Sequence, residues 1–140
     1  MADKFVLNYH IEGEDLTQAG EASSKMKMAL RQLGLPPEVI RKASICMYEG
    51  EINMVIHANG GEITVEVGLD EIDITMEDNG PGIENVDQAM EEGFSTAGEV
   101  ARDLGFGAGM GLPNMKRYSD EMTVESTVGV GTTVRMKIRI

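Results

Sequence analysis

Hydrophobic and polar residues alternate in several short segments of the chain, a period-two pattern that predicts strands with one buried face. The first such segment covers residues 5–11. Four more occur as two pairs, each flanking a glycine-containing turn: residues 63–67 and 72–76, and residues 122–124 and 134–140. Each pair predicts an antiparallel hairpin.

Apolar residues spaced three or four apart predict three helices. The first covers residues 15–33, and Gly34 supplies its C-terminal stop. The second begins at Pro36-Pro37, a pair that suits the first turn of a helix, and continues toward Asn59. The third covers residues 112–118.

Glycine is concentrated in residues 78–111, where the periodicity breaks down apart from a short helix predicted over residues 86–92. Long segments of this kind inside a compact domain are usually functional lids. We therefore expect residues 78–111 to contribute to a binding site.

The order of these elements is strand, helix, helix, strand, strand, glycine-rich segment, helix, strand, strand. This order does not alternate as repeated β-α-β units would. It predicts an α/β fold of the α+β kind, a two-layer sandwich in which a mixed, mostly antiparallel sheet carries its helices on one face. With 140 residues and no internal repeat, the chain is expected to form a single domain over residues 1–140.

The formal net charge is −12, from 12 Lys and Arg against 24 Asp and Glu. Such a charge disfavours direct binding to nucleic acid or to an anionic membrane surface. Local amide groups or a bound metal can still hold a small anionic ligand. The single cysteine, Cys46, permits no intramolecular disulfide, and no signal peptide or membrane-length apolar run is found, so we expect a cytoplasmic protein.

Three polar residues follow one ridge of the second predicted helix: Glu49, Asn53 and His57 are spaced four apart. The amide oxygen of Asn53 is a ligand type that Mg²⁺ accepts, and Glu49 can act as a base beside a terminal phosphate. Taken alone, this spacing is also common on solvated helix faces. For His57, packing or capping near the helix end is the alternative to a direct role.

A second candidate motif, Asp78-Asn79-Gly80-Pro81-Gly82, follows a predicted strand directly. A carboxylate at the strand end can accept a hydrogen bond from the exocyclic amino group of adenine, a group that guanine lacks at that position. Gly80 and Gly82 would let the backbone approach the ring closely. An ordinary turn is the alternative, because the motif is rich in turn-forming residues.

A third motif opens the last predicted helix and contains Gly105, Gly107, Gly109, Met110, Gly111 and Leu112. Glycines at every second position allow backbone amides to surround phosphates, and the helix N-terminus that follows adds a favourable dipole. A triphosphate suits this arrangement, and a merely flexible lid is the alternative. A P-loop, a dinucleotide-binding turn, an ordinary protein-kinase catalytic loop and a Cys/His zinc site do not occur in the sequence.

Together, these motifs resemble the GHKL ATPase superfamily, whose Bergerat fold is shared by gyrase B, MutL and the catalytic domains of histidine kinases. The small size resembles the anti-sigma-factor serine/threonine kinases. The Gly93-Phe94-Ser95-Thr96 stretch and the run from Gly109 to Arg117 are most similar to switch kinases of the RsbT type. Residues 99–104 form a longer segment than those kinases have.

The resemblance implies binding of ATP and Mg²⁺, with Asn53 for the metal, Glu49 as catalytic base and Asp78 for adenine. It places Gly80 and Gly82 under the ring and the later glycines around the phosphates. Thr132 matches the family threonine that supports the adenine-binding aspartate through water.

The implied activity is phosphorylation of a serine or threonine on a STAS-domain partner in a sigma-factor or stress-signalling switch. A sigma factor or a phosphatase are further implied partners, and a homodimer is left open. Two other functions remain open: a non-catalytic regulator whose ATP-ordered lid binds a partner, and a detached histidine-kinase catalytic domain.

Overall fold

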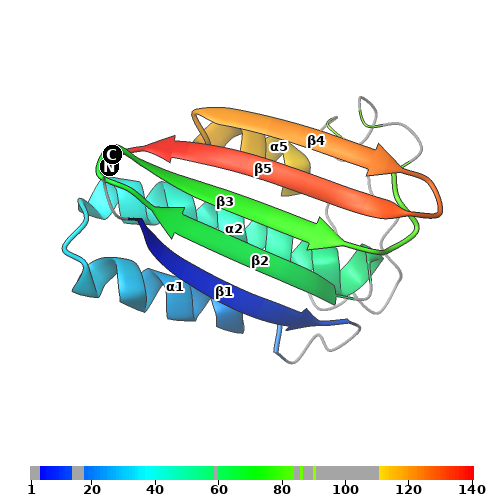
Figure 1. The fold of residues 1–140 in the computed structure, drawn as a ribbon, viewed down its shortest axis with the longest axis horizontal. Coiled ribbons are helices and arrows are strands. Elements are labelled where there is room, and N and C mark those ends of the chain that lie inside the picture. The colour runs from blue at the N-terminus through cyan, green and yellow to red at the C-terminus, as the bar shows by residue number, and fades with distance from the viewer. Residues whose placement is uncertain (1–3, 14–17, 59, 84–85, 87–89, 91–110) are drawn as a thin grey trace.

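The computed structural model describes residues 4–13, 18–58, 60–83, 86, 90 and 111–140 of the chain. Three helices and five strands make up this part (Figure 1). In chain order they are β1 (Phe5–Glu12), α1 (Glu21–Gln32), α2 (Pro37–His57), β2 (Gly60–Val67), β3 (Glu71–Asp78), α5 (Gly111–Tyr118), β4 (Glu121–Thr127) and β5 (Gly131–Arg139).

The strands form one sheet in the order β1-β2-β3-β5-β4, and each neighbouring pair is antiparallel. Both predicted hairpins are confirmed, with Val65 opposite Ile74 in one and Val124 opposite Val134 in the other. The sequence predicted a mixed, mostly antiparallel sheet, whereas every pair among the described strands is antiparallel. The observed register keeps the alternating apolar residues of paired strands on one face of the sheet.

All three helices cover one face of the sheet, so the predicted two-layer sandwich is confirmed (Figure 1). The helix α2 lies in the middle of the helical layer and contacts both α1 and α5. The core between the layers is aliphatic and rich in methionine, and its fully buried side chains include Met26, Leu30, Met47, Ile74 and Ile138. Because α2 packs against both other helices and the sheet, its residues are held firmly in place.

The start of α1 differs from the sequence prediction. The helix begins at Glu21, whereas the apolar spacing placed the start at residue 15; residues 14–17 are outside the described part. Gly20 precedes the helix with φ +94°, a left-handed conformation that interrupts the helical backbone. Gly34, with φ +77°, ends it as expected.

Two other predicted features fall largely outside the described residues. Most of the helix predicted over residues 86–92 lies there, although the amide of Met90 donates to the carbonyl of Val86 at 3.0 Å. The glycine run up to residue 110 lies there completely. Within the described part, no helix is long and apolar enough to span a lipid bilayer.

Candidate functional site

A narrow cavity of about 70 Å³ opens where the second half of α2, the end of β3, the start of α5 and the strand β5 meet. Six residues singled out in the sequence line it: Asn53, His57, Asp78, Gly82, Leu112 and Thr132. These residues come from segments far apart in the chain, and the fold brings them together. The rest of the lining is mainly apolar and includes Met54, Met76 and Met115.

Asp78 is the last residue of β3, and backbone amides hold its carboxylate in place. Its Oδ1 accepts hydrogen bonds from the amide of Gly80 at 2.9 Å and from the amide of Thr132 at 3.2 Å. Both hydrogen bonds described for this carboxylate go to Oδ1. The other oxygen can therefore accept a hydrogen bond from an amino group on a ligand in the cavity.

Gly80 and Gly82 are needed for packing within the protein itself. A Cβ atom on Gly80 would lie 2.7 Å from the Cα of Ala58, and one on Gly82 would lie 2.5 Å from the carbonyl oxygen of Thr127. Gly82 also has φ +81°, which strains other residues. Gly80 therefore lies close to the residue that follows α2, and Gly82 lies close to the β4–β5 hairpin. Their predicted contact with an adenine ring stays a prediction.

Thr132 supports Asp78 through its backbone, and the implied support through water stays a prediction. Its backbone amide bonds the carboxylate without a bridging group, and its hydroxyl lies 2.8 Å from the Oγ of Ser126. The Ser126 Oγ also accepts a hydrogen bond from the amide of Ile83 at 2.7 Å. Ser126 thus connects the threonine to the loop that follows Asp78.

Sequence reasoning missed Ser126, although the alternation of its strand contains a signal. Ser126 lies on the same face of its strand as Met122 and Val124, which pack against the core. A hydroxyl at an inward-facing position requires a hydrogen-bond partner. A serine at the end of an apolar stripe, directly before the Gly-rich turn, could therefore have been marked as a site residue.

The predicted ridge on α2 lies against the first turns of α5. A Cβ atom on Gly111 would lie only 2.8 Å from Nδ2 of Asn53, so Gly111 allows the helix N-terminus to approach this side chain. One turn away, Nδ2 of Asn114 donates to Oε1 of Glu49 at 3.4 Å. The structure therefore brings Glu49 and Asn53 together beside the start of α5.

His57 completes the ridge, and burial lowers the pKa of its imidazole. The ring lines the same cavity as Asn53 and stays neutral near pH 7. A neutral ring suits a packing role in the wall of the cavity.

Several predicted site residues lie outside the described part: Gly105, Gly107, Gly109 and Met110. Their assignment to the phosphates stays a prediction. Among the residues that the structure does describe, no group of three or more His, Cys, Asp or Glu side chains could hold a metal ion. A metal at this site would therefore depend on Asn53, on water and on the oxygens of a bound nucleotide.

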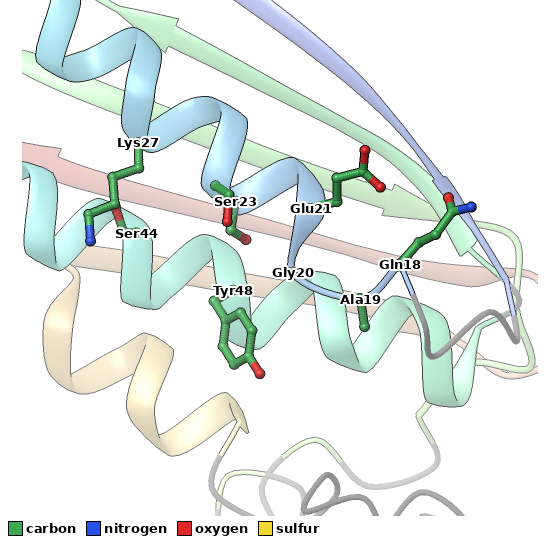
Figure 2. Close-up of a pocket in the computed structure, with 9 residues that line it drawn as sticks. Gln18, Ala19, Gly20, Glu21, Ser23, Lys27, Ser44 and Tyr48 are labelled. Atoms are coloured by element: carbon green, nitrogen blue, oxygen red, sulfur yellow. The ribbon is translucent and has the colours of Figure 1, made fainter.

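A larger groove of about 570 Å³ lies between α1 and α2, and Figure 2 shows Lys27 and Ser23 on one side of it and Ser44 and Tyr48 on the other. Its position at the N-terminus of α1 is one that an anion could occupy. A side chain of the protein takes this place: the buried carboxylate of Glu51 accepts hydrogen bonds from four groups, the amides of Gly20, Ala22 and Ser23 and the hydroxyl of Ser23. The groove is therefore a poor phosphate site.

Comparison with known proteins shows the family to which this chain belongs. The family model for histidine kinase-, DNA gyrase B- and HSP90-like ATPases matches residues 45–140, which include every site residue named above. The serine/threonine-protein kinase RsbT of Bacillus subtilis (strain 168) is 38% identical over 87 residues, which cover 59% of this chain and 59% of that kinase.

Anti-sigma F factors are similar over a longer stretch. The protein from Caldanaerobacter subterraneus subsp. tengcongensis is 40% identical over 110 residues, covering 75% of this chain and 73% of the relative. The one from Geobacillus thermodenitrificans is 34% identical over 103 residues, covering 74% and 64%. The chain belongs to the histidine kinase-, DNA gyrase B- and HSP90-like ATPase family, and within it is similar to the anti-sigma-factor kinases.

Proposed function

We propose that this protein is an ATP-dependent serine/threonine protein kinase that phosphorylates a STAS-domain partner in a cytoplasmic sigma-factor or stress-signalling switch. Family membership supports the use of ATP, and 38% identity to a serine/threonine-protein kinase supports the reaction. A sigma factor or a phosphatase would be a further partner in such a switch.

The cavity suits adenine. Oδ2 of Asp78 would accept a hydrogen bond from the exocyclic amino group, while the thioether side chains of Met54, Met76 and Met115 would contact the ring. Gly50 makes room for this methionine cluster, because a Cβ atom there would lie 2.0 Å from the sulfur of Met76. The base would thus be held by one directional hydrogen bond in an apolar slot.

The phosphates would extend from this slot toward the N-terminus of α5, where the helix dipole favours negative charge. Asn53 stands beside that N-terminus and offers its amide oxygen to Mg²⁺. When bound, Mg²⁺ would neutralise charge that develops on the phosphate oxygens during transfer.

Glu49 would accept the proton from the hydroxyl of the protein substrate as that oxygen attacks the terminal phosphorus. Its carboxylate is half-buried and lies one turn from Asn53, and Asn114 orients it through the 3.4 Å hydrogen bond. A base in this position supplies general-base catalysis, while most of the acceleration comes from positioning and charge stabilisation.

The observation that carries the proposal is the meeting of Glu49 and Asn53 with the first turns of α5. It would set the proposed base and the proposed metal ligand on one side of the helix end where the phosphates would bind. A solvated helix face, the alternative for these two residues, would have left them away from other elements.

The test is a transfer assay with γ-labelled ATP, Mg²⁺ and a STAS-domain protein from the same organism. We expect a labelled phosphoprotein from the wild type and a loss of at least about 100-fold in rate from Glu49→Gln, with ATP affinity retained. Glu38→Gln, on the exposed N-terminal turn of the same helix, is the matched control. Transfer that is absent in the wild type or unaffected by Glu49→Gln would contradict the kinase assignment.

A second candidate function is favoured by the similarity to anti-sigma F factors, which cover more of the chain than the kinase does. In this alternative, ATP orders a surface that binds a sigma factor, and no phosphate is transferred. Binding of a sigma factor that strengthens at least about tenfold with ATP, without any phosphoprotein, would favour it, because only a ligand with different affinities for two states shifts them.

The third possibility, a histidine-kinase catalytic domain, can be distinguished from both candidates by the acid stability of the phosphorylated product. A phosphoserine or phosphothreonine ester survives acid, whereas phosphohistidine does not.

A further inference from the structure

Methionine is the most frequent large apolar residue in the wall of the cavity beside α5. The chain contains 11 methionines, and three of them line this cavity: Met54 from α2, Met76 from β3 and Met115 from α5. A thioether packs like a hydrocarbon, but its sulfur can be oxidised to a sulfoxide, a reaction that leucine, isoleucine and valine cannot undergo. The wall of the cavity therefore contains a chemical group that the proposed phosphoryl transfer does not use.

The three thioether side chains are packed tightly from behind. A Cβ atom on Gly50 would overlap the sulfur of Met76 and would lie 3.5 Å from the sulfur of Met115. A Cβ atom on Gly61 would overlap the terminal methyl group of Met54. The backbones of α2 and β2 thus lie directly against these side chains and leave little room there for an additional atom.

The cavity gives a small oxidant access to these side chains. The exposed fractions of Met54, Met76 and Met115 are only 4%, 3% and 1%, so the cavity that they line is the opening through which a reagent can approach them. Its volume is about 70 Å³, whereas a water molecule takes about 30 Å³ in the liquid, and hydrogen peroxide is only slightly larger than water. Peroxide therefore fits the empty cavity, and a bound adenine ring would exclude it.

We propose that the methionines of this cavity are oxidation sites, and that hydrogen peroxide weakens ATP binding by converting them into methionine sulfoxides. The inference rests on the proposed adenine site. In the reaction, the sulfur attacks one oxygen of the peroxide, an S–O bond forms and the O–O bond breaks. The hydroxide that leaves takes up the proton of the transferred oxygen and becomes water. The sulfur loses two electrons, and the peroxide gains them.

A sulfoxide would alter the wall of the cavity in two ways. Its oxygen is a polar acceptor, and an acceptor without a donor in an apolar environment costs free energy. The oxygen also adds volume beside Gly50 and Gly61, where the side chains are already in close contact with the backbone, and overpacking displaces neighbouring groups. Both effects change the apolar surface proposed to contact adenine, so ATP binding should become weaker.

Two other sulfur-containing residues react differently from the cavity methionines. Cys46 is buried, and burial raises the pKa of its thiol to about 12, so the reactive thiolate is scarce at neutral pH. Met28 lies on α1, is 60% exposed and does not line the cavity. Its oxidation is expected whether or not a nucleotide is bound, and it provides an internal control for the reaction with peroxide.

The test treats the wild-type protein with hydrogen peroxide, with and without saturating ATP and Mg²⁺, and then removes nucleotide and oxidant. Peptide mass spectrometry should find sulfoxide at Met28 in both samples and at the cavity methionines only in the sample without ATP. Calorimetric titration should then show at least about tenfold weaker ATP binding for the sample oxidised without ATP. Equal oxidation of the cavity methionines in both samples, no oxidation of them in either, or unchanged ATP affinity of the oxidised protein overturns the inference.

Leucine variants show whether the cavity methionines are responsible. The triple variant Met54→Leu, Met76→Leu and Met115→Leu should keep its own untreated ATP affinity after peroxide, whereas the matched variant Met28→Leu should lose affinity as the wild type does. A triple variant that loses affinity like the wild type overturns the inference. Circular dichroism checks folding, and protection by ATP is measured on the wild type, so it does not depend on these variants. Failure of the untreated wild type to bind ATP would instead contradict the proposed function.

Discussion

The N-termini of α1 and α5 are built from the same backbone groups and serve opposite purposes. At α1, the buried carboxylate of Glu51 accepts three backbone amides and one hydroxyl, so the protein supplies its own anion. At α5, the first turn contains no acidic residue, and Gly111 brings the helix end against Asn53. The amides at the start of α1 are bound by a side chain of the protein, whereas the start of α5 is where we propose that a ligand binds.

The comparison shows why a large groove is a weak guide to function. The groove at α1 is several times the volume of the cavity beside α5, about 570 Å³ against about 70 Å³. The amides at its helix end are already satisfied, whereas the smaller cavity unites a carboxylate, an amide side chain and a helix N-terminus. The chemistry of the lining residues, rather than the volume, therefore favours the cavity beside α5 as the candidate site.

The largest effect is expected from a substitution at the N-terminus of α5, the open end, because we propose that the phosphates and the metal bind there. Asn53→Ala removes the proposed metal ligand and is expected to reduce phosphoryl transfer by about 100-fold or more, because stabilisation of phosphate charge by a metal is worth several kcal/mol. The melting temperature should change little, since Asn53 is only half-buried. Asn8→Ala, on the far edge of the sheet, is the control for loss of an asparagine and should retain transfer.

A change at the N-terminus of α1, the closed end, is expected to reduce stability and to leave ATP binding nearly unchanged. Glu51→Ala leaves three amides and a hydroxyl without their acceptor in the protein interior, which should lower the free energy of unfolding by about 3 kcal/mol or more. Thermal and urea unfolding measure this loss, while ATP affinity of the folded fraction should stay within about threefold of the wild type. A Glu51→Ala variant that keeps the wild-type free energy of unfolding but no longer binds ATP would show that the two helix ends do not have separate roles.

Ser126 offers a smaller test within the open end. Ser126→Ala removes the hydroxyl that connects Thr132 with the amide of Ile83 and is expected to weaken ATP binding about threefold to tenfold, the equivalent of one ordinary hydrogen bond. Ser126→Thr keeps the hydroxyl and should bind more tightly than the alanine variant. Ser24→Ala, at an exposed position of α1, is the control, and equal affinities for all of these proteins would remove Ser126 from the site.

The smallest expected effect concerns pH. Burial lowers the pKa of His57 in the folded protein, so the unfolded chain takes up a proton first as the pH falls below about 6.5. Stability therefore decreases between that pH and the lower pKa of the folded state. Thermal unfolding between pH 8 and 5 should show a steeper decrease in stability for the wild type than for His57→Gln, and parallel curves would contradict a lowered pKa of this half-buried imidazole.

Local patterns were sufficient for most of the fold. Alternation predicted the strands and both hairpins, because one face of the sheet is buried, and apolar spacing predicted α2 and α5 closely. The start of α1 was wrong because it depends on Gly20 and on Glu51, which lies 31 residues from Gly20 in the chain. Periodicity cannot predict a hydrogen bond between two helices.

The candidate site residues that could be predicted from the sequence are those whose side-chain chemistry alone suggests a role. Asp78, Asn53 and Thr132 were identified from motifs, and the fold brings them to one cavity. Ser126 and the methionine cluster were missed because their roles arise from packing between strands and helices. The close approach of Gly80 to Ala58 likewise depends on tertiary contact.

Calorimetric titration with ATP and with GTP in the presence of Mg²⁺ tests the central claim most directly. The proposed recognition by Asp78 requires saturable heat with ATP and binding of GTP that is weaker by about tenfold or more, because the guanine ring has no amino group to donate at that position. Asp78→Asn should reduce the affinity for ATP and the preference between the two bases. No saturable heat with ATP at millimolar concentration, or equal affinity for both nucleotides, would contradict the proposed site.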